Sequence, residues 1–388
     1  MGLTVSAEEI IRDRKILKRE SFLNLSWNSY LVSKIGILFL LSAIQTLLFV
    51  LVGNLVLEIK GITLSFWFIL FSTSCLANVL GLNISSAFNS AVTVYVLIPL
   101  LLIPQMILSG VLFSFDKLHS FISNKEKVPI VADMMASRWA YEALAVEQFI
   151  FNNYEQGFYE YEKKSSIADF KSAFVADELE ARNQYVLADF DSQVDTVQRQ
   201  IKENLEILKS QIVFEPFKGK LENSNLSKLL SPDGYTKEFG QSLQDYIKDY
   251  RKHYQTVYND QVIITDKKKS WYEKQGFDLN NEKDLNFNES LSDLVKNVNT
   301  KERLIIHDGR IIQQIDPIFQ DPNPQHLLDY RTGFFFPEKY FLGIQFSTFT
   351  FNSMAIWLMS ALLYLTLYFE LLRKLVGISG NFAIVKGK

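Results

Sequence analysis

The sequence predicts a mainly α-helical membrane protein, a polytopic bundle of transmembrane helices with a large helical insertion before the last span. Long apolar blocks gather near both ends of the 388-residue chain, although the composition as a whole is only 48% hydrophobic. A polar stretch separates these blocks, and we assign it to residues 151–345. Within that stretch apolar residues recur at helical spacing. These three observations define the fold class.

Four apolar blocks are long enough to cross a bilayer. The hydrocarbon core is about 30 Å thick and needs about 20 residues of helix. The blocks are residues 35–59, 62–88, 92–115 and 349–372. Helices of soluble proteins seldom run this long without a charged face. Pro99 and Pro104 in the third block are compatible with a span because neighbouring helices can satisfy the carbonyls that they free.

Basic residues flank the outer ends of this set of spans. They are Arg12, Arg14, Lys15, Lys18, Arg19 and Lys34 before the first span, and Arg373, Lys374, Lys386 and Lys388 after the last. Lys and Arg concentrate on the cytoplasmic side of membrane proteins. We therefore expect both termini in the cytoplasm and the long polar region outside. Cys75 is the only cysteine, so that region contains no intrachain disulfide.

Two helices and a hairpin are predicted in the polar region. Residues 190–212 carry an apolar stripe at spacings of three and four, which Pro216 ends. A second helix follows the turn at 231–234, with tyrosines along one face. The two helices can pair as an antiparallel hairpin, and the tyrosine stripe is either a ligand surface or, as we favour, their packing seam. Asp308-Gly309 between apolar runs predicts a short β-hairpin over 304–313.

No catalytic or metal-binding pattern is present in the sequence. The four histidines are widely separated, and neither a phosphate-binding loop nor a broad basic patch for nucleic acid occurs. We therefore expect no enzymatic activity, cofactor or metal in this chain. Polar residues within the predicted spans include Gln45, Asn83, Gln105 and Asn352. They either line a pathway or, as is more usual, make hydrogen bonds between helices.

Two further segments differ from ordinary spans and loops. Residues 8–20 form a charged helix before the first span, which is either a basic membrane anchor or a docking element for a cytoplasmic motor. Residues 137–149 form an amphipathic stretch after the third span, too polar to cross the membrane and too apolar to leave it. We expect interfacial or re-entrant helices there, over residues 116–150.

These segments, in this order, resemble the membrane domain of the G subfamily of ATP-binding cassette (ABC) exporters. The charged helix that contacts the ATPase in that subfamily is matched by Arg12, Arg14, Lys18, Arg19 and Glu20. A Ser-Gly pair followed by two bulky residues, which form a plug on the dimer axis, is matched by Ser109 to Leu112, with Val111 in place of a leucine. The re-entrant motif is matched by Arg138, Trp139 and Glu142, with tryptophan in place of tyrosine.

The resemblance implies the permease part of an ATP-driven bacterial exporter, with a lipophilic or amphipathic substrate. It further implies an ABC ATPase partner that holds ATP and magnesium, a second permease copy in a homodimer, surrounding membrane lipid, and two earlier spans that this sequence lacks. The location implied is the cell inner membrane, with a periplasmic region that can bind a partner. The alternative is a non-transporting membrane receptor or scaffold whose periplasmic helical domain binds that partner.

The expected organisation therefore has six parts. They are a cytoplasmic coupling helix (1–34), three spans (35–115), re-entrant or interfacial helices (116–150), an extracytoplasmic helical domain (151–345), the last span (346–374) and a cytoplasmic tail (375–388).

Overall fold

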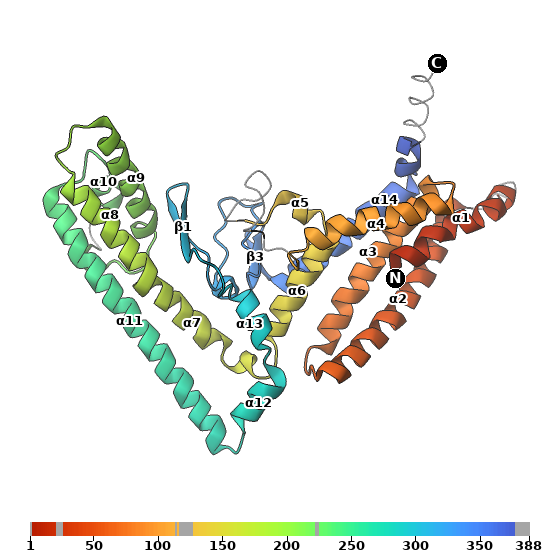
Figure 1. Ribbon diagram of the computed structural model, residues 1–388, viewed down its shortest axis with the longest axis horizontal. Helices are drawn as coiled ribbons and strands as arrows, with labels where there is room; N and C mark the ends of the chain where they lie inside the picture. Colours follow the sequence, from red (N-terminus) through yellow and green to blue (C-terminus); the bar gives the residue numbers. More distant parts are fainter. Residues whose placement is uncertain (1, 21–25, 113–114, 116–126, 222–224, 377–388) are drawn as a thin grey trace. The chain divides into compact units, whose positions relative to one another are not determined.

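The computed structural model describes residues 2–20, 26–112, 115, 127–221 and 225–376 (Figure 1). The chain forms two compact units, which are treated separately below. Unit 1 comprises residues 1–152 and 322–388, and unit 2 comprises residues 153–321. The expected outer domain of 151–345 is therefore too long at its C-terminal end, because residues 322–345 pack within unit 1.

Unit 1 is a helical bundle to which the end of the chain returns. Its elements are α1 (Gly2–Glu20), α2 (Trp27–Leu57), α3 (Thr63–Ala87), α4 (Ala91–Ile107), α5 (Ile130–Asp133), α6 (Ala136–Ile150), β3 (Glu338–Phe341), β4 (Ile344–Ser347) and α14 (Thr348–Tyr368). Helix α3 lies in the middle, because α1, α2, α6 and α14 all pack against it. The chain is therefore mainly helical, as predicted.

Three of these helices are long and apolar enough to cross a membrane, namely α2, α3 and α14, and α4 is a shorter apolar helix of 17 residues. The third span was expected to continue to residue 115, but α4 ends at Ile107. The backbone turns away soon afterwards, since Gly110 has φ +83°. Helix α2 instead begins earlier than expected, at Trp27, where the Ser26 hydroxyl accepts a hydrogen bond from the Ser29 amide.

Unit 2 is built on two long helical runs. The first is α7 (Tyr159–Phe170), a π-helical turn η4 (Lys171–Val175) and α8 (Ala176–Ala188), and the second is the 38-residue α11 (Lys237–Lys274). The remaining elements are η3 (Glu155–Gly157), α9 (Asp195–Ile212), η5 (Gly219–Leu221), α10 (Leu226–Leu229), α12 (Leu279–Asn286), α13 (Glu289–Val295), β1 (Leu304–His307), β2 (Arg310–Gln313) and η6 (Pro317–Phe319).

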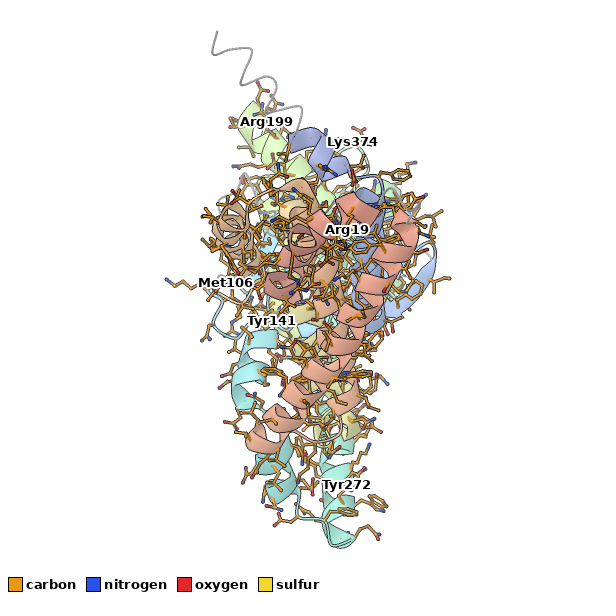
Figure 2. All side chains as sticks on the ribbon, turned by 90° about the vertical axis from the view of Figure 1, so that its right-hand side faces the viewer. Arg19, Met106, Tyr141, Arg199, Tyr272 and Lys374 are labelled. Atoms are coloured by element: carbon orange, nitrogen blue, oxygen red, sulfur yellow. The ribbon has the colours of Figure 1, made fainter. Side chains whose placement is uncertain are left out.

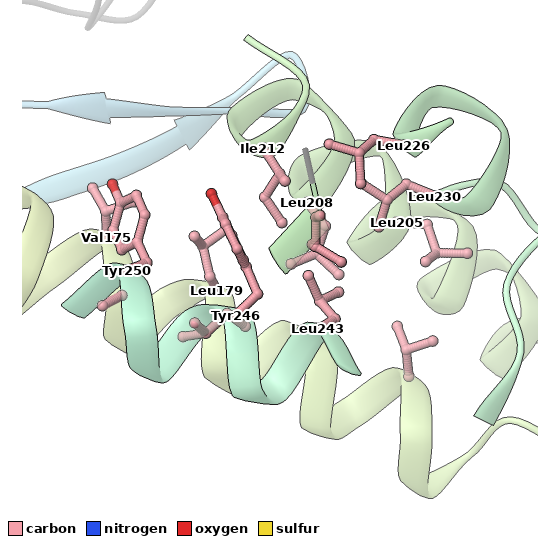
Figure 3. Packing of buried hydrophobic residues seen from close by; sticks show 14 of the residues in the cluster. Val175, Leu179, Leu205, Leu208, Ile212, Leu226, Leu230, Leu243, Tyr246 and Tyr250 are labelled. Atoms are coloured by element: carbon pink, nitrogen blue, oxygen red, sulfur yellow. The ribbon is translucent and has the colours of Figure 1, made fainter. Parts of the chain in front are cut away.

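The core of unit 2 lies where α8, α9 and α11 meet (Figure 3). Leu205 and Leu208 of α9 are buried there, and so are Leu243, Tyr246 and Tyr250 of α11. Tyr246 and Tyr250, the first two tyrosines of the stripe on α11, are therefore packing residues, as favoured above. Helix α11 was expected to pair with α9, but its main packing partner is the α7–α8 run. The sequence did not predict these two helices.

The predicted hairpin is present in unit 2. Strands β1 and β2 pair antiparallel, with His307 opposite Arg310. Asp308 and Gly309 both have positive φ, of 48° and 69°. This is the backbone that an Asp-Gly turn of two residues adopts, so the sequence signal and the geometry agree.

Candidate functional site

Helix α1 packs closely against α3 at Gly81. A Cβ atom added to Gly81 of α3 would lie 2.0 Å from the Ser6 hydroxyl oxygen and 2.8 Å from the Leu3 carbonyl oxygen. Ser6 and Ala7 are fully buried in this crossing. Small side chains let two helix backbones approach closely, and that approach is the main source of attraction between helices in a bilayer. The first half of α1 is therefore a part of the bundle.

Arg14 of α1 closes the C-terminal end of α3. Its guanidinium donates hydrogen bonds to the carbonyl oxygens of Ser86 (3.1 Å) and Phe88 (3.0 Å), and it also contacts the side chain of Asn89. The last carbonyls of a helix have no partner within the helix, and a cation there also complements the helix dipole. In return, the Ser85 hydroxyl accepts hydrogen bonds from the Ile10 and Ile11 amides, both 3.0 Å long.

An ionic contact joins α1 to α2. The Lys34 ammonium of α2 lies 2.8 Å from a carboxylate oxygen of Glu9 and 2.6 Å from one of Asp13. The Tyr30 hydroxyl donates to Asp13 at 3.0 Å. Because Glu9 and Asp13 are one turn apart, both reach the same lysine. A displacement of α1 would consequently act on α2 as well as on α3.

Three basic side chains of α1 face outward. Arg12, Lys15 and Arg19 are exposed, at helical spacings of three and four that place them on one face. Arg19 is labelled on α1 in Figure 2. Of the residues expected to contact an ATPase, Arg14 binds α3 within this chain. The side chains of Lys18 and Glu20 lie outside the described part of the structure. Lys15 was not among the residues expected to contact an ATPase, but its spacing from Arg12 and Arg19 places it on the same face of α1.

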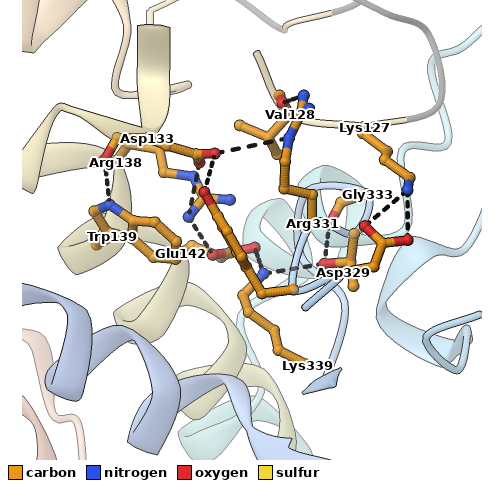
Figure 4. Close-up of polar contacts among 12 residues, drawn as sticks. Lys127, Val128, Asp133, Arg138, Trp139, Glu142, Asp329, Arg331, Gly333 and Lys339 are labelled. Carbon is orange, nitrogen blue, oxygen red and sulfur yellow. Dashed lines mark hydrogen bonds and ion pairs between the residues drawn. The ribbon is translucent and has the colours of Figure 1, made fainter. Parts of the chain in front are cut away.

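A second polar site is centred on α6 (Figure 4). The Glu142 side chain is fully buried, and three polar groups contact its carboxylate. The Lys339 ammonium lies at 2.9 Å, the Asn352 amide nitrogen at 2.8 Å and the Arg138 guanidinium at 3.4 Å. Lys339 comes from β3 and Asn352 from α14. Glu142 therefore joins α6 to two elements that are about two hundred residues away in sequence.

The same network extends from Arg138 to Asp133 at the end of α5. The Arg138 guanidinium lies 3.6 Å from the Asp133 carboxylate and 3.9 Å from the centre of the Trp139 ring. The Trp139 indole N–H donates to the Asp133 carbonyl oxygen at 2.7 Å. Arg331, on the returning chain, lies 3.8 Å from Asp133. The expected Arg138–Trp139–Glu142 motif is thus one connected structure, and Trp139 holds α5 against α6.

Burial and the neighbouring charges together set the pKa values of the ionisable groups in this network. Burial alone disfavours the Glu142 carboxylate, but Arg138 and Lys339 outweigh it, so the pKa of Glu142 lies below its usual value. The pKa of Lys339 is also lowered, by burial and by repulsion from Arg138. Burial raises the pKa of Asp133, against the attraction of Arg138 and Arg331. Glu142 is accordingly the stable anion around which the cations are arranged.

Part of this network was not predicted from the sequence. Arg138, Trp139, Glu142 and Asn352 were identified, but not Asp133, Arg331 or Lys339. The last two lie in the segment that had been assigned to the outer domain. An aromatic run containing two cations, residues 330–341, was the available signal. Cations within so apolar a segment need buried counter-ions.

The predicted plug residues follow α4. Val111 and Leu112 are each 55% exposed in this chain. The preceding turn is tight, because a Cβ on Gly110 would lie 2.7 Å from the Phe334 ring. Ser109 supports the turn by accepting a hydrogen bond from the Val111 amide at 3.2 Å. The turn at Ser109 and Gly110 therefore holds Val111 and Leu112 in exposed positions.

The polar residues of the apolar helices make contacts between helices. The Asn83 amide donates to the Leu363 carbonyl oxygen of α14 at 2.9 Å, and Gln105 of α4 accepts from the Ser137 amide of α6 at 3.2 Å. Asn352 binds Glu142, as described above. Gln45 is exposed on α2. Within the described residues, no cluster of three or more His, Cys, Asp or Glu side chains could bind a metal ion.

Residues 1–148 match the family model of the ABC-2 type transporter. This segment is similar to an ABC-2 membrane domain. The ABC-2-like segment, residues 1–148, contains α1 to α4 and nearly all of α6, and it ends just before unit 2. No curated protein and no solved structure matches the chain. The match and the apolar helices support an integral membrane protein whose N-terminal segment is similar to the permease component of an ABC transporter.

Proposed function

We propose that this chain is the permease part of an ATP-driven ABC exporter of the G-subfamily type. The observation that carries the proposal is the ABC-2-like segment, in which α1 is fixed to α2 and α3 while Arg12, Lys15 and Arg19 remain exposed. Arg12 pairs with Glu9 of the same helix, and Lys15 and Arg19 lie on the same exposed face. This basic face is available to an acidic surface of a partner. ATP and magnesium belong to that partner, the ABC ATPase.

The contacts of α1 supply a route for coupling. Movement of the ATPase would displace the exposed face that includes Arg12 and Arg19, together with Lys18 and Glu20. Arg14 and Ser85 would carry that displacement to α3, and Lys34 would carry it to α2. Coupling by this route requires a stiff connection, and the backbone contact at Gly81 supports such stiffness.

The exposed apolar pair at the end of α4 supports the rest of the mechanism. In a homodimer, Val111 and Leu112 of two copies would meet across the central axis and close the pathway toward the outside. Apolar, uncharged spans suit a lipophilic or amphipathic substrate, since a desolvated ion would find few partners there. Gln45, which is exposed on α2, would border this pathway, and Asn83, Gln105 and Asn352 would hold together the helices that form it. The bilayer is the inner membrane, with the termini in the cytoplasm and unit 2 in the periplasm.

The test is an uncoupling experiment on the complex of this chain with its ATPase, reconstituted in lipid nanodiscs. The variant is Lys15→Glu with Arg19→Glu. We expect it to weaken ATPase binding by at least tenfold and to abolish stimulation of ATP hydrolysis by the permease. The matched control is Arg373→Glu with Lys374→Glu, which reverses two basic residues beyond α14. Unchanged stimulation in the α1 variant would contradict the proposed docking face.

One observation favours a second candidate, a non-transporting receptor or scaffold. Unit 2 has a core of its own and lies outside the ABC-2-like segment, as a domain that binds a periplasmic partner would. The two candidates differ in their response to ATP. A receptor would retain partner binding in the Lys15→Glu, Arg19→Glu variant and would show no ATP-dependent change in the bundle.

A further inference from the structure

The two edges of the β1–β2 hairpin in unit 2 have different surroundings. In an antiparallel pair of strands, residue pairs that exchange both backbone hydrogen bonds alternate with pairs that exchange none. The Gln314 amide donates to the Arg303 carbonyl oxygen at 3.0 Å, so this pair belongs to the bonded set. The N–H and C=O groups of the other set point away from the hairpin. That set contains Leu304 and Ile306 of β1 and, opposite them, Gln313 and Ile311 of β2.

Side chains of unit 2 cover the outer edge of β2. The Gln211 side-chain amide of α9 donates to the Ile311 carbonyl oxygen at 3.5 Å. The Gln320 side-chain amide, which follows η6, donates to the Gln313 carbonyl oxygen at 3.4 Å. Helix α9 also packs against β2. This edge of the hairpin is therefore closed to a further strand.

The outer edge of β1 has no such cover. Among the described residues, no hydrogen bond reaches the outward N–H and C=O groups of Leu304 and Ile306. The Ile306 side chain is 38% exposed. Proteins commonly block an exposed edge with a lysine, a proline or a bulge, and β1 contains none of these. Strand β1 is therefore an open edge.

We propose that β1 is the docking site for an extended strand of a partner protein, which adds to the hairpin as its third strand. An extended backbone presents N–H and C=O groups at the spacing that satisfies those of Leu304 and Ile306. A third strand also stabilises the hairpin, because two strands alone are only marginally stable in water. The inference requires neither transport activity nor a particular side of the membrane.

The charges around β1 favour a different protein over a second copy of this chain. Two β1 strands can pair antiparallel with Leu304 of each opposite Ile306 of the other. This register places Glu302 opposite Asp308 of the other copy, and like charges opposite each other destabilise a strand pair. A better partner carries a cation near Asp308, whose side chain is 76% exposed. It also carries apolar residues opposite Leu304 and Ile306, and an anion near Arg303.

The probe for this site is the labelled peptide Lys-Thr-Ile-Thr-Ile-Glu, added to the full chain in nanodiscs and followed by fluorescence anisotropy. In the antiparallel register, its isoleucines lie opposite Ile306 and Leu304. We expect binding that slows the hydrogen exchange of residues 302–307. Methylating the backbone nitrogens of the two isoleucines removes the donors that face β1 and should weaken binding by about tenfold. Methylating those of the two threonines, which face away, is the matched control and should change the affinity little.

A pair of protein variants tests the same edge. Ile306→Pro removes the outward N–H but no hydrogen bond of the hairpin, and proline is tolerated at a strand edge of this kind. It should abolish peptide binding, whereas Ile306→Ala keeps the N–H and should retain most of the binding. Hydrogen exchange of residues 310–314 checks that the hairpin of the proline variant is intact.

Three results would each overturn the proposal. The first is that the peptide does not bind the unmodified chain. The second is that methylation at the isoleucines and at the threonines has the same effect, which needs no change to the protein and so holds even if Ile306→Pro misfolds. The third is that exchange of residues 302–307 slows in detergent as the protein concentration rises without peptide, because a second copy would then occupy the edge.

Discussion

At the scale of single residues, Lys339 anchors the returning segment, residues 322–347, to α6 of the bundle. Its ammonium is 1% exposed and lies against the fully buried Glu142 carboxylate. Removing one member of such a pair leaves the other charge buried without its closest partner, which costs about 3–5 kcal/mol. We therefore expect Lys339→Met to lower the thermal unfolding midpoint of the protein in detergent strongly. Combining it with Glu142→Gln should restore part of the loss.

Lys127 provides the control for that prediction. It forms a similar ion pair with Asp329 at 2.8 Å, but its side chain is 17% exposed. Water can replace part of that interaction, so Lys127→Met should lower the midpoint less than Lys339→Met does. Equal losses from the two variants would show that burial of the α6 network is not what stabilises the returning segment.

At the scale of elements, α1 and α3 cross closely at Gly81. Gly81→Ala would place a methyl group where Ser6 and Leu3 already lie, so α1 must shift. We expect faster hydrogen exchange of the α1 amides in this variant, together with a lower unfolding midpoint. Gly53→Ala in α2 is the control, because nothing lies within 4 Å of an added Cβ there, and alanine favours a helix. Unchanged exchange in Gly81→Ala would contradict a tight crossing.

The elements also show what could be predicted from the sequence. Length and uncharged composition identified α2, α3 and α14, and an Asp-Gly turn identified the β1–β2 hairpin. Helices α7 and α8 were missed because their buried residues are few and a π-helical turn at Lys171–Val175 interrupts the helical period. The end of α4 was predicted too far along the chain, because apolar residues continue past Ile107, where the helix ends, and past the turn at Gly110.

The site could be predicted only where its residues are close in sequence. Arg138 and Glu142 are one turn apart on α6, so a motif could reveal them. Their partner Lys339 reaches them only after the chain has passed through unit 2, and no local pattern encodes that contact. The docking role of Arg14 stays a prediction, but its hydrogen bonds to the carbonyl groups at the end of α3 could not be predicted from the sequence.

At the scale of the whole molecule, the chain is divided between two cores. All members of the α6 network belong to unit 1, and the core of unit 2 is drawn entirely from residues 170–315. We therefore expect residues 153–321, produced alone, to be helical and to unfold cooperatively, as measured by circular dichroism in urea. A fragment that is unfolded or that aggregates in the absence of unit 1 would contradict this independence.

The central claim is that the bundle acts as the permease of an ABC transporter. It is tested most directly by the mass and composition of the native complex, extracted from source membranes and measured by mass spectrometry. The account predicts that this chain, or a longer product that contains it, is found with an ABC ATPase and releases that ATPase when Lys15 and Arg19 are changed to glutamate. A native product of 44.8 kDa with no associated ATPase would contradict the claim and favour a receptor or scaffold.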